Sequence, residues 1–329
     1  MKETIFSIVV TTYNQQDTLV ETLESIKAQT YKPIELIISD DCSTDNTLNI
    51  ADKWLSENKE RFVNTKIVKT PLNSGISANV SNGLKNANGE FLKYMAGDDL
   101  LLQDAIESMS DFLNQNKNAR FCISKVRNLY TYDKKYLYGI TSPIKSIEKK
   151  IKKFKTPDEQ FRILAFTVAS PAVGSFFRKS VFEEKGYPDE DIKWTDDRAI
   201  WLKLNRKNET LFYLPKLTSF WRRHLNSTSF SQSKNFDIVL IKCELDIIYR
   251  YVIPNISLLS LKESLDILSY IVYLQIIVRN GGGYKAHKKA RWAKLISPSF
   301  FLSRPRTFKD KIDKFIIYKK LGFDFMKRR

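Results

Sequence analysis

Adjacent aspartate pairs occur three times in this chain, and each pair follows or opens a stretch with the pattern of a strand or a helix start: Asp40-Asp41, Asp98-Asp99 and Asp196-Asp197. Neighbouring carboxylates repel each other, and burying them without partners is costly. Three such pairs therefore indicate a site that meets cations, a nucleotide or the proton of a hydroxyl group. We interpret the chain as an enzyme that uses an activated, phosphate-bearing donor and a divalent metal.

The composition excludes several other chemistries. Cys42, Cys122 and Cys243 are far apart in the chain, which favours a reducing compartment and predicts no disulfide framework. Only two histidines occur, too few for a clustered zinc site, so a carboxylate is the expected proton acceptor. The chain has no Gly-x-x-x-x-Gly-Lys-Ser/Thr loop, and the glycine run 281–283 is expected to end a helix or form a hinge.

Charge and hydropathy indicate a soluble or peripheral protein. Met1 leads directly into an apolar strand with no secretory signal, and no apolar run reaches the roughly 18 residues that span a bilayer. The net charge is +17, and residues 281–329 carry 15 Lys and Arg against three Asp, a net +12. This asymmetry predicts that the tail meets an anionic surface, either lipid headgroups or nucleic acid. The basic stretch 145–155 is expected to be a solvated helix or loop, with contact to an anionic membrane or acceptor as the alternative.

Strand and helix signals alternate through the first part of the chain. The pattern predicts strands at 5–12, 35–39, 66–69, 90–95, 120–127 and 173–178, two short strands around Pro215 within 210–223, and helices at 17–29, 44–55, 77–87, 104–115, 197–205, 236–251 and 258–278. Such alternation predicts an α/β fold, a mostly parallel sheet with helices on both faces, followed by a helical C-terminal appendage. We expect a catalytic domain over 1–230, made of the halves 1–127 and 128–230, and a basic helical region over 231–329 that is a candidate for membrane association.

Ligands of such sheets bind beyond the carboxyl ends of the strands, where the first two acid pairs fall. Tyr13 is suited to stacking on a base, and Asp41 to accepting a pyrimidine N–H. The Asp98-Asp99 pair is suited to a hard divalent cation that also binds substrate phosphates. The alternative for this pair is an N-cap of a helix over 100–113.

The ordered motifs resemble the inverting, family-two glycosyltransferases of GT-A fold over roughly residues 4–230. They are Val-Thr-Thr-Tyr-Asn from Val10, Asp-Asp-Cys-Ser-Thr-Asp-Asn-Thr from Asp40, Asn-x-Gly-Ile-Ser-x-Asn from Asn73, Gly-Glu-x-x-x-Tyr from Gly89 and Gly-Asp-Asp-Leu from Gly97. Ala96 stands where the longer form of the family's metal motif has its leading acid. The resemblance implies a Rossmann-like GT-A sheet in which Thr11, Tyr13 and Asp41 hold uracil, Asp98 holds the ribose, and Asp99 holds Mn²⁺ or Mg²⁺ bridging two phosphates. It also implies that the half 1–127 binds the nucleotide-sugar and the half 128–230 binds the acceptor.

The third acid pair is similar to the family's acidic pair at a helix start, which implies that Asp197 is the catalytic base. Helix capping with a salt bridge to Arg198 or Arg178 is the alternative. The segment from Trp221 to Ser229 resembles the family's Arg-x-His-x-x-x-x-Ser loop, so Arg222 or His224 is expected to meet the departing diphosphate.

The expected activity is metal-dependent inverting transfer of a sugar, a hexose by our interpretation, from a nucleotide-sugar, a UDP-sugar by resemblance, to a hydroxyl of a saccharide acceptor. That acceptor is expected on a lipid diphosphate carrier during surface-polysaccharide synthesis of the O-antigen or capsule kind. The enzyme is then cytoplasmic and peripheral on the inner face of the membrane, with no nucleic-acid partner. The rivals are a nucleotidyltransferase, which would need a Gly-rich basic loop after the first strand, a basic nucleic-acid-binding protein, and an inactive sugar-nucleotide binder.

Overall fold

The chain divides into two compact units. The computed structural model describes residues 4–133, 135–167, 170–194, 197–224 and 234–295. The first unit comprises Met1–Arg127 with Ile140–Trp221, and the second comprises Asn128–Gly139 with Arg222–Arg329. The domain boundaries expected from the sequence, at 127 and 230, stay predictions.

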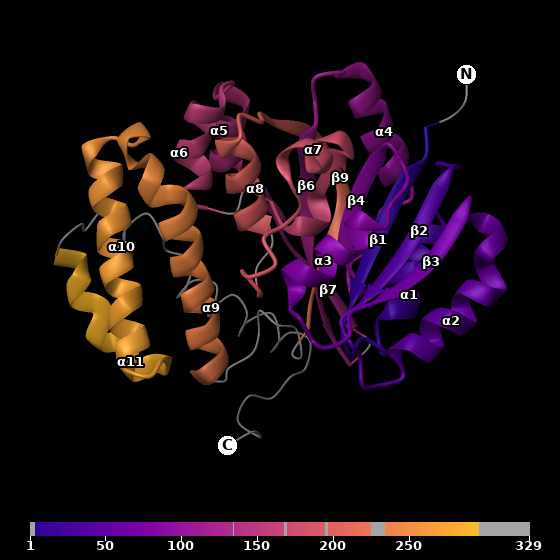
Figure 1. The fold of residues 1–329 in the computed structure, drawn as a ribbon, viewed down its shortest axis with the longest axis horizontal. Coiled ribbons are helices and arrows are strands. Elements are labelled where there is room, and N and C mark those ends of the chain that lie inside the picture. Colours follow the sequence, from indigo (N-terminus) through magenta and orange to yellow (C-terminus); the bar gives the residue numbers. More distant parts are fainter. Residues whose placement is uncertain (1–3, 134, 168–169, 195–196, 225–233, 296–329) are drawn as a thin grey trace. The chain divides into compact units, whose positions relative to one another are not determined.

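Most of one sheet lies in the first unit, with strands joined in the order β3-β2-β1-β4-β8-β6-β9-β5 and with β7 pairing to β6 (Figure 1). Residues 128–139, from the end of β6 and most of β7, are assigned to the second unit. The strands are β1 (Phe6–Thr12), β2 (Ile34–Asp40), β3 (Asn64–Lys69), β4 (Phe91–Ala96), β5 (Leu100–Leu101), β6 (Phe121–Tyr132), β7 (Lys135–Ser142), β8 (Ser175–Arg178) and β9 (Leu211–Arg223). The first four are mutually parallel, while β8 runs antiparallel to both β4 and β6. The expected α/β class with helices on both faces is confirmed. The sequence predicted a mostly parallel sheet, whereas the sheet is mixed, because β8 and β9 add antiparallel pairs to the parallel strands.

Helices cover both faces of the parallel strands. Those of the first unit are α1 (Leu19–Lys27), α2 (Thr47–Asn58), α3 (Ile76–Lys85), α4 (Ala105–Gln115), α5 (Lys145–Lys153), α6 (Pro157–Leu164), α7 (Ser180–Lys185) and α8 (Asp197–Arg206). Ile8 and Val10 share a core with Leu23 of α1. A Cβ on Gly83 of α3 would lie 2.3 Å from Cγ1 of Val9. Because successive strand side chains point to opposite faces, α1 and α3 pack on opposite sides of β1.

Between residues 234 and 295 the second unit is helical. It contains α9 (Lys234–Ile247), α10 (Leu261–Arg279) and α11 (Gly283–Ala290), and α10 packs against both of the others. The Ser260 hydroxyl and the Glu263 carboxylate form a capping box that begins α10. Gly281, with a φ of 73°, follows its end, which confirms the expected helix stop at the glycine run. In the described part of the chain, no helix combines the length and apolar character needed to cross a bilayer.

Some local predictions were wrong. Residues 211–223 form one continuous strand, β9, and not two strands around Pro215. Pro215 lies at an exposed position of β9, where a strand tolerates a missing N–H. The sequence reasoning also missed β5, β7, α6 and α7. The part of the basic tail beyond residue 295, which was expected to meet an anionic surface, lies outside the described residues.

Candidate active site

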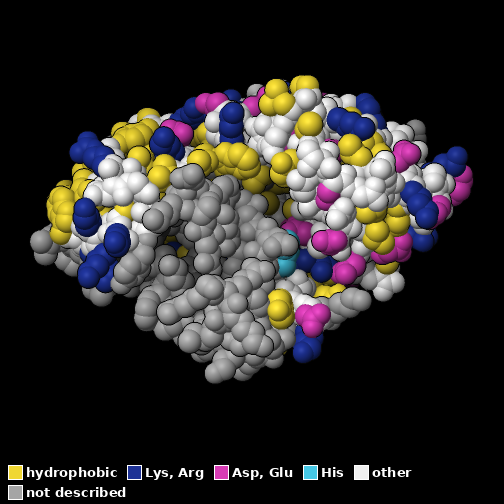
Figure 2. Space-filling model, turned by 90° about the horizontal axis from the view of Figure 1, so that it is seen from below, with side chains coloured by type: hydrophobic (Ala, Val, Ile, Leu, Met, Phe, Trp, Pro, Cys, Tyr) yellow, Lys and Arg dark blue, Asp and Glu magenta, His cyan; other side chains and the backbone are white. Residues whose placement is uncertain are grey.

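The first two acid pairs lie on either side of the end of β1. Thr12 is opposite Asp40 of β2, and Thr11 is opposite Ala96 of β4. The same strand end accepts two backbone bonds of 2.9 Å, one from the Asp41 N–H to the Thr12 carbonyl and one from Gly97 to Thr11. Figure 2, seen from below Figure 1, shows Asp and Glu side chains gathered on the described part of this face. Parallel pairing therefore brings two segments separated by more than fifty residues to one rim.

Asp40 is fully buried and holds the turn after β2. Its carboxylate accepts hydrogen bonds from the Thr12 hydroxyl at 2.8 Å, the Ser43 N–H at 2.8 Å and the Ser43 hydroxyl at 2.6 Å. These donors compensate the burial of the charge. Asp40 is thus a structural anchor of the rim, which the sequence reasoning did not distinguish from its neighbour.

Asp41 is also buried, and its carboxylate organises the loop before α3. It accepts bonds from the Thr70 hydroxyl at 2.7 Å, the Ser74 N–H at 2.8 Å and the Gly75 N–H at 2.9 Å. Carboxylates that accept backbone N–H bonds fix loop geometry strongly. Recognition of uracil by Asp41 stays a prediction. An N–H of uracil would bind a carboxylate oxygen that already accepts a hydrogen bond from one of these donors.

The loop after β1 is held against the loop after β2. Asn14, with a φ of 51°, accepts a bond from the Thr44 N–H at 2.8 Å through Oδ1 and donates its own N–H to the Ser43 hydroxyl at 2.9 Å. Tyr13, next to it, is 44% exposed, as a ring available for stacking must be. Thr11 is half-buried and donates its hydroxyl to the Met95 carbonyl at 3.3 Å.

Asp98 and Asp99 leave β4 through a tight turn at Gly97. A Cβ at Gly97 would lie 2.4 Å from the Gln15 Oε1 and 2.9 Å from a Thr12 methyl carbon, so only glycine fits without displacement. Asp99 is buried and Asp98 half-buried. Because β5 follows at once and α4 begins at Ala105, the alternative of a helix N-cap for this pair is wrong.

The oxygen chemistry of this turn fits a hard divalent cation that substrate phosphates help to bind. The described residues contain no group of three or more His, Cys, Asp or Glu placed to hold a metal by themselves. Mg²⁺ commonly uses one or two carboxylates together with substrate oxygens and waters. Asp99, with Asp98 beside it, matches that limited donor set.

Lys93, in the middle of β4, is a charged residue that the sequence reasoning missed. Its side chain is fully buried and its ammonium donates to the carbonyls of Val173 and Ser175, the former contact being the shorter. Burial lowers its pKa to about 7, and the negative charge of Asp99 opposes part of that fall. A lysine flanked by Phe91, Leu92, Tyr94 and Met95 was the signal available in the sequence.

Asp197 begins α8, and the chain just before it contacts the loop that Asp41 holds. The Ser77 hydroxyl donates to the Ile192 carbonyl at 2.6 Å, and a Cβ on Gly75 would lie 2.6 Å from the Lys193 carbonyl oxygen. The approach of residue 193 therefore requires glycine at 75, where φ is 96°. Asp197 is half-buried. Asp196 lies outside the described residues.

The alternative for Asp197 named Arg178 and Arg198 as salt-bridge partners. Arg178 pairs with Glu90 at 2.8 Å. Arg198 is buried and donates to the carbonyls of Leu164 and Ala165, which ties α8 to the end of α6. The role of Asp197 as a base stays a prediction.

Arg222 and His224 belong to the second compact unit. Arg222 is buried near the end of β9, and His224 is half-buried just after that strand. Their contact with a diphosphate stays a prediction, and the rest of the predicted loop, 225–229, lies outside the described residues.

A parallel α/β half with carboxylates beyond its strand ends, continued by antiparallel strands, defines a GT-A type of fold. The sequence profile of glycosyl transferase family 2 matches residues 7–184, more than half of the chain. The chain belongs to glycosyl transferase family 2, which confirms the resemblance drawn from its motifs.

Curated relatives share moderate identity. A putative glycosyltransferase, EpsE of Bacillus subtilis, is 34% identical over 112 residues, which cover 34% of this chain and 39% of that protein. The GalNAc(5)-diNAcBac-PP-undecaprenol beta-1,3-glucosyltransferase of Campylobacter jejuni is 29% identical over 70% of this chain and 68% of its own length. This chain thus spans well under half of the first relative and about two thirds of the second.

Solved structures support the fold. S. aureus TarS 1-349 in complex with UDP-GlcNAc superposes with a TM-score of 0.54 at 18% identity, covering 93% of this chain and 92% of that one. The mannosyltransferase PcManGT from Pyrobaculum calidifontis, in complex with GDP-Man and Mn²⁺, gives 0.53 at 14% identity, covering 92% and 75%. At these identities the likeness shows the GT-A fold alone.

Proposed function

We propose that the chain transfers a sugar from a UDP-sugar to a hydroxyl of a saccharide acceptor, with inversion at the anomeric carbon. Asp197 takes the proton of the acceptor hydroxyl as the oxygen attacks the anomeric carbon, and the bond to the diphosphate breaks in the same displacement. Thr11, Tyr13, Asp41 and Asp98 bind the nucleoside, and Arg222 or His224 meets the diphosphate as it departs.

A divalent metal, Mn²⁺ or Mg²⁺, belongs to this proposal. Held by Asp99, it would offset charge that develops on the leaving diphosphate. Neighbouring residues position Asp99, because Gly97, in the turn that leads to it, packs closely against Thr12.

One observation carries the proposal: the segments that bear Asp41 and Asp99 meet at the end of β1, and residues 192–193, a few positions before Asp197, contact the loop that Asp41 holds. Asp41 and Gly97 bind the end of β1, and residues 192–193 pack on the loop that Asp41 holds. Family membership supports the same chemistry. The nucleotidyltransferase rival finds no such support, because residues 11–14, at the end of the first strand and just after it, contain neither glycine nor a basic residue.

The acceptor is proposed to be a saccharide on a lipid diphosphate, used in surface-polysaccharide synthesis at the inner face of the membrane. The Campylobacter relative, named as a glucosyltransferase that acts on an undecaprenol diphosphate acceptor, supports this choice. So does the basic character of residues 281–329. We expect anionic liposomes to retain the intact chain at low salt and to release a chain ending at residue 295. Equal behaviour of the two would remove the membrane part of the proposal.

A donor-hydrolysis screen tests the activity. UDP-, GDP- and TDP-sugars are offered with Mn²⁺ or Mg²⁺, and we expect turnover of a UDP-sugar, loss of activity with a chelator, and no activity in Asp99→Ala. Asp104→Ala, which removes an exposed carboxylate in a salt bridge with Lys216, is the matched control and should retain activity. Chelator-resistant turnover in wild type would contradict the role of the metal.

The base is tested separately from the donor site. Asp197→Asn should bind UDP-sugar with wild-type affinity, because the base contacts the acceptor, while transfer falls at least a hundredfold. Calorimetry measures the first quantity and product formation the second. A comparable loss of donor affinity would show that Asp197 is not the base.

A further inference from the structure

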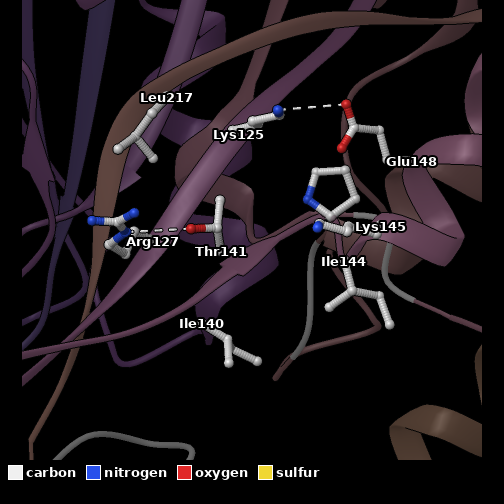
Figure 3. Close-up of a pocket in the computed structure, with 9 residues that line it drawn as sticks. Lys125, Arg127, Ile140, Thr141, Ile144, Lys145, Glu148 and Leu217 are labelled. Atoms are coloured by element: carbon white, nitrogen blue, oxygen red, sulfur yellow. Dashed lines mark hydrogen bonds and ion pairs between the residues drawn. The ribbon is translucent and has the colours of Figure 1, made fainter.

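A pocket of about 530 Å³ opens in the first unit between β6, β7, β9 and the start of α5, and the donor chemistry does not use it. Three cations line it: Lys125 and Arg127 from β6 and Lys145 from α5. They face one carboxylate, Glu148. Figure 3 shows Arg127 on one side of the pocket and Lys145 with Glu148 on the other. The lining therefore has an excess of positive charge.

Two of these cations have unused hydrogen-bonding capacity. The Arg127 Nε donates to the Thr141 hydroxyl at 3.3 Å, which orients the guanidinium and leaves its two terminal amino groups available. Across the described ranges neither Arg127 nor Lys145 has a carboxylate within salt-bridge distance. Glu148 is shared between Lys125 at 3.5 Å and Lys152 at 2.8 Å, so its charge is already neutralised. A planar guanidinium with free amino groups matches two oxygens of a phosphate.

The remaining lining is apolar. Ile140, Pro143, Ile144 and Leu217 complete the walls, and the Ile140 side chain is 55% exposed. A small sugar would leave these walls in water, and inorganic phosphate would use only the cations. A ligand with a phosphate head and a hydrocarbon chain would use both.

The pocket is connected to the proposed base through packed elements. Contacts join α5 to α6 and α6 to α8, and Arg198, the residue after Asp197, donates to carbonyls at the end of α6. A group bound at α5 would thus have a fixed position relative to α8, the helix that begins with Asp197.

We propose that this pocket binds the diphosphate of an isoprenoid-linked acceptor, with Arg127 and Lys145 on the phosphate oxygens and the apolar walls against the first isoprene unit. The inference rests on the proposed function, because it assigns the acceptor of that reaction a binding site. It commits to an isoprenoid diphosphate rather than to phospholipid headgroups in general.

The test uses the full chain in chelator, with farnesyl diphosphate as the probe and isothermal calorimetry as the measurement. We expect farnesyl diphosphate to bind at least about tenfold more tightly than inorganic pyrophosphate, because only the former meets the apolar walls. The double variant Arg127→Gln/Lys145→Gln should weaken its binding at least about tenfold. Lys149→Gln/Lys153→Gln removes the same charge from exposed positions of α5 outside the pocket and should change it less than twofold. Ile140→Ser should reduce the preference over pyrophosphate.

Four results would overturn the proposal. Excess UDP displacing the probe would put it in the donor site. Equal losses in the two double variants would indicate unspecific charge attraction. If Arg127→Gln/Lys145→Gln weakens binding to phosphatidylglycerol vesicles by the same factor as binding to farnesyl diphosphate, the surface recognises lipid headgroups in general.

The failure of the pocket can be distinguished from the failure of the proposed activity. If wild type hydrolyses a UDP-sugar but does not bind farnesyl diphosphate, the pocket alone is overturned. If wild type binds farnesyl diphosphate but turns over no nucleotide-sugar, the pocket is supported and the proposed activity is contradicted.

Discussion

Lys93 ties the stability of the first unit to pH in a way that can be measured. Its ammonium is fully buried in β4, and burial lowers its pKa to about 7 against an ordinary value of 10.5. Between these values the unfolded chain binds a proton at this site that the folded chain has released. The free energy of unfolding therefore rises with pH above about 7, with a limiting slope of roughly 1.4 kcal/mol per pH unit from this group.

The magnitude follows from the fraction of Lys93 that is neutral. With a folded pKa of about 7, Lys93 is protonated in half of the folded molecules at pH 7 and in almost none of them at pH 9. Integrating the proton difference over this interval gives roughly 2 kcal/mol. Lys93→Met keeps the length of the side chain and removes the titration, so its free energy of unfolding should lack this gain. The Val173 carbonyl keeps a donor in the variant, the Ser219 hydroxyl at 3.1 Å.

Urea unfolding followed by far-UV circular dichroism, in chelator at pH 7 and pH 9, checks this expectation. The quantity is the free energy of unfolding of wild type minus that of Lys93→Met. This difference should be roughly 2 kcal/mol more favourable to wild type at pH 9 than at pH 7. Cys122, whose pKa burial raises, acts in the opposite direction but equally in both proteins. Lys53→Met, at an exposed position of α2, is the matched control and should show no shift. A shift below about 0.5 kcal/mol for Lys93→Met would refute the reasoning.

Three further substitutions test the packing of α3, the turn after β4 and the contacts of Asp41. Gly83→Ala places a Cβ 2.3 Å from the Val9 Cγ1, so urea unfolding should show a loss of roughly 1–3 kcal/mol although alanine favours helices; a gain would contradict the close packing of α3. Gly97→Ala should weaken metal-dependent UDP binding in calorimetry more than it lowers stability, and unchanged binding would show that the turn does not position Asp99. Asp41→Asn supplies one acceptor oxygen in place of two for its three donors, so stability should fall by roughly 1–3 kcal/mol, and an unaltered unfolding midpoint would contradict its anchoring role.

The sequence predicted the parallel half well because its signals are local. An apolar run such as 34–40, followed by capping residues and then a helical period, defines each strand and helix with little outside help. The carboxyl ends of parallel strands share one edge, so the gathering of the first two acid pairs followed from their position after such runs. The least regular region, 128–194, gave weaker signals, and β7, α6 and α7 were missed there.

Only the tertiary structure decided what individual polar residues do. Asp40 and Asp41 are identical in type and adjacent, yet one holds the turn after β2 and the other the loop before α3, because different donors reach them. Pro215 stays within β9 since an exposed position tolerates its missing N–H, and no sequence period reports that exposure.

The amino-acid sequence by itself determined the α/β class, the family and the acids at the strand ends, because these depend on neighbours within a few residues. Long-range packing decided the rest. Lys93 loses its hydration only because carbonyls from residues 173 and 175 close over it, and the pocket at Arg127 and Lys145 exists only where β6, β7, β9 and α5 meet. Burial and cavity shape are properties of segments far apart in the chain, and no local pattern encodes them.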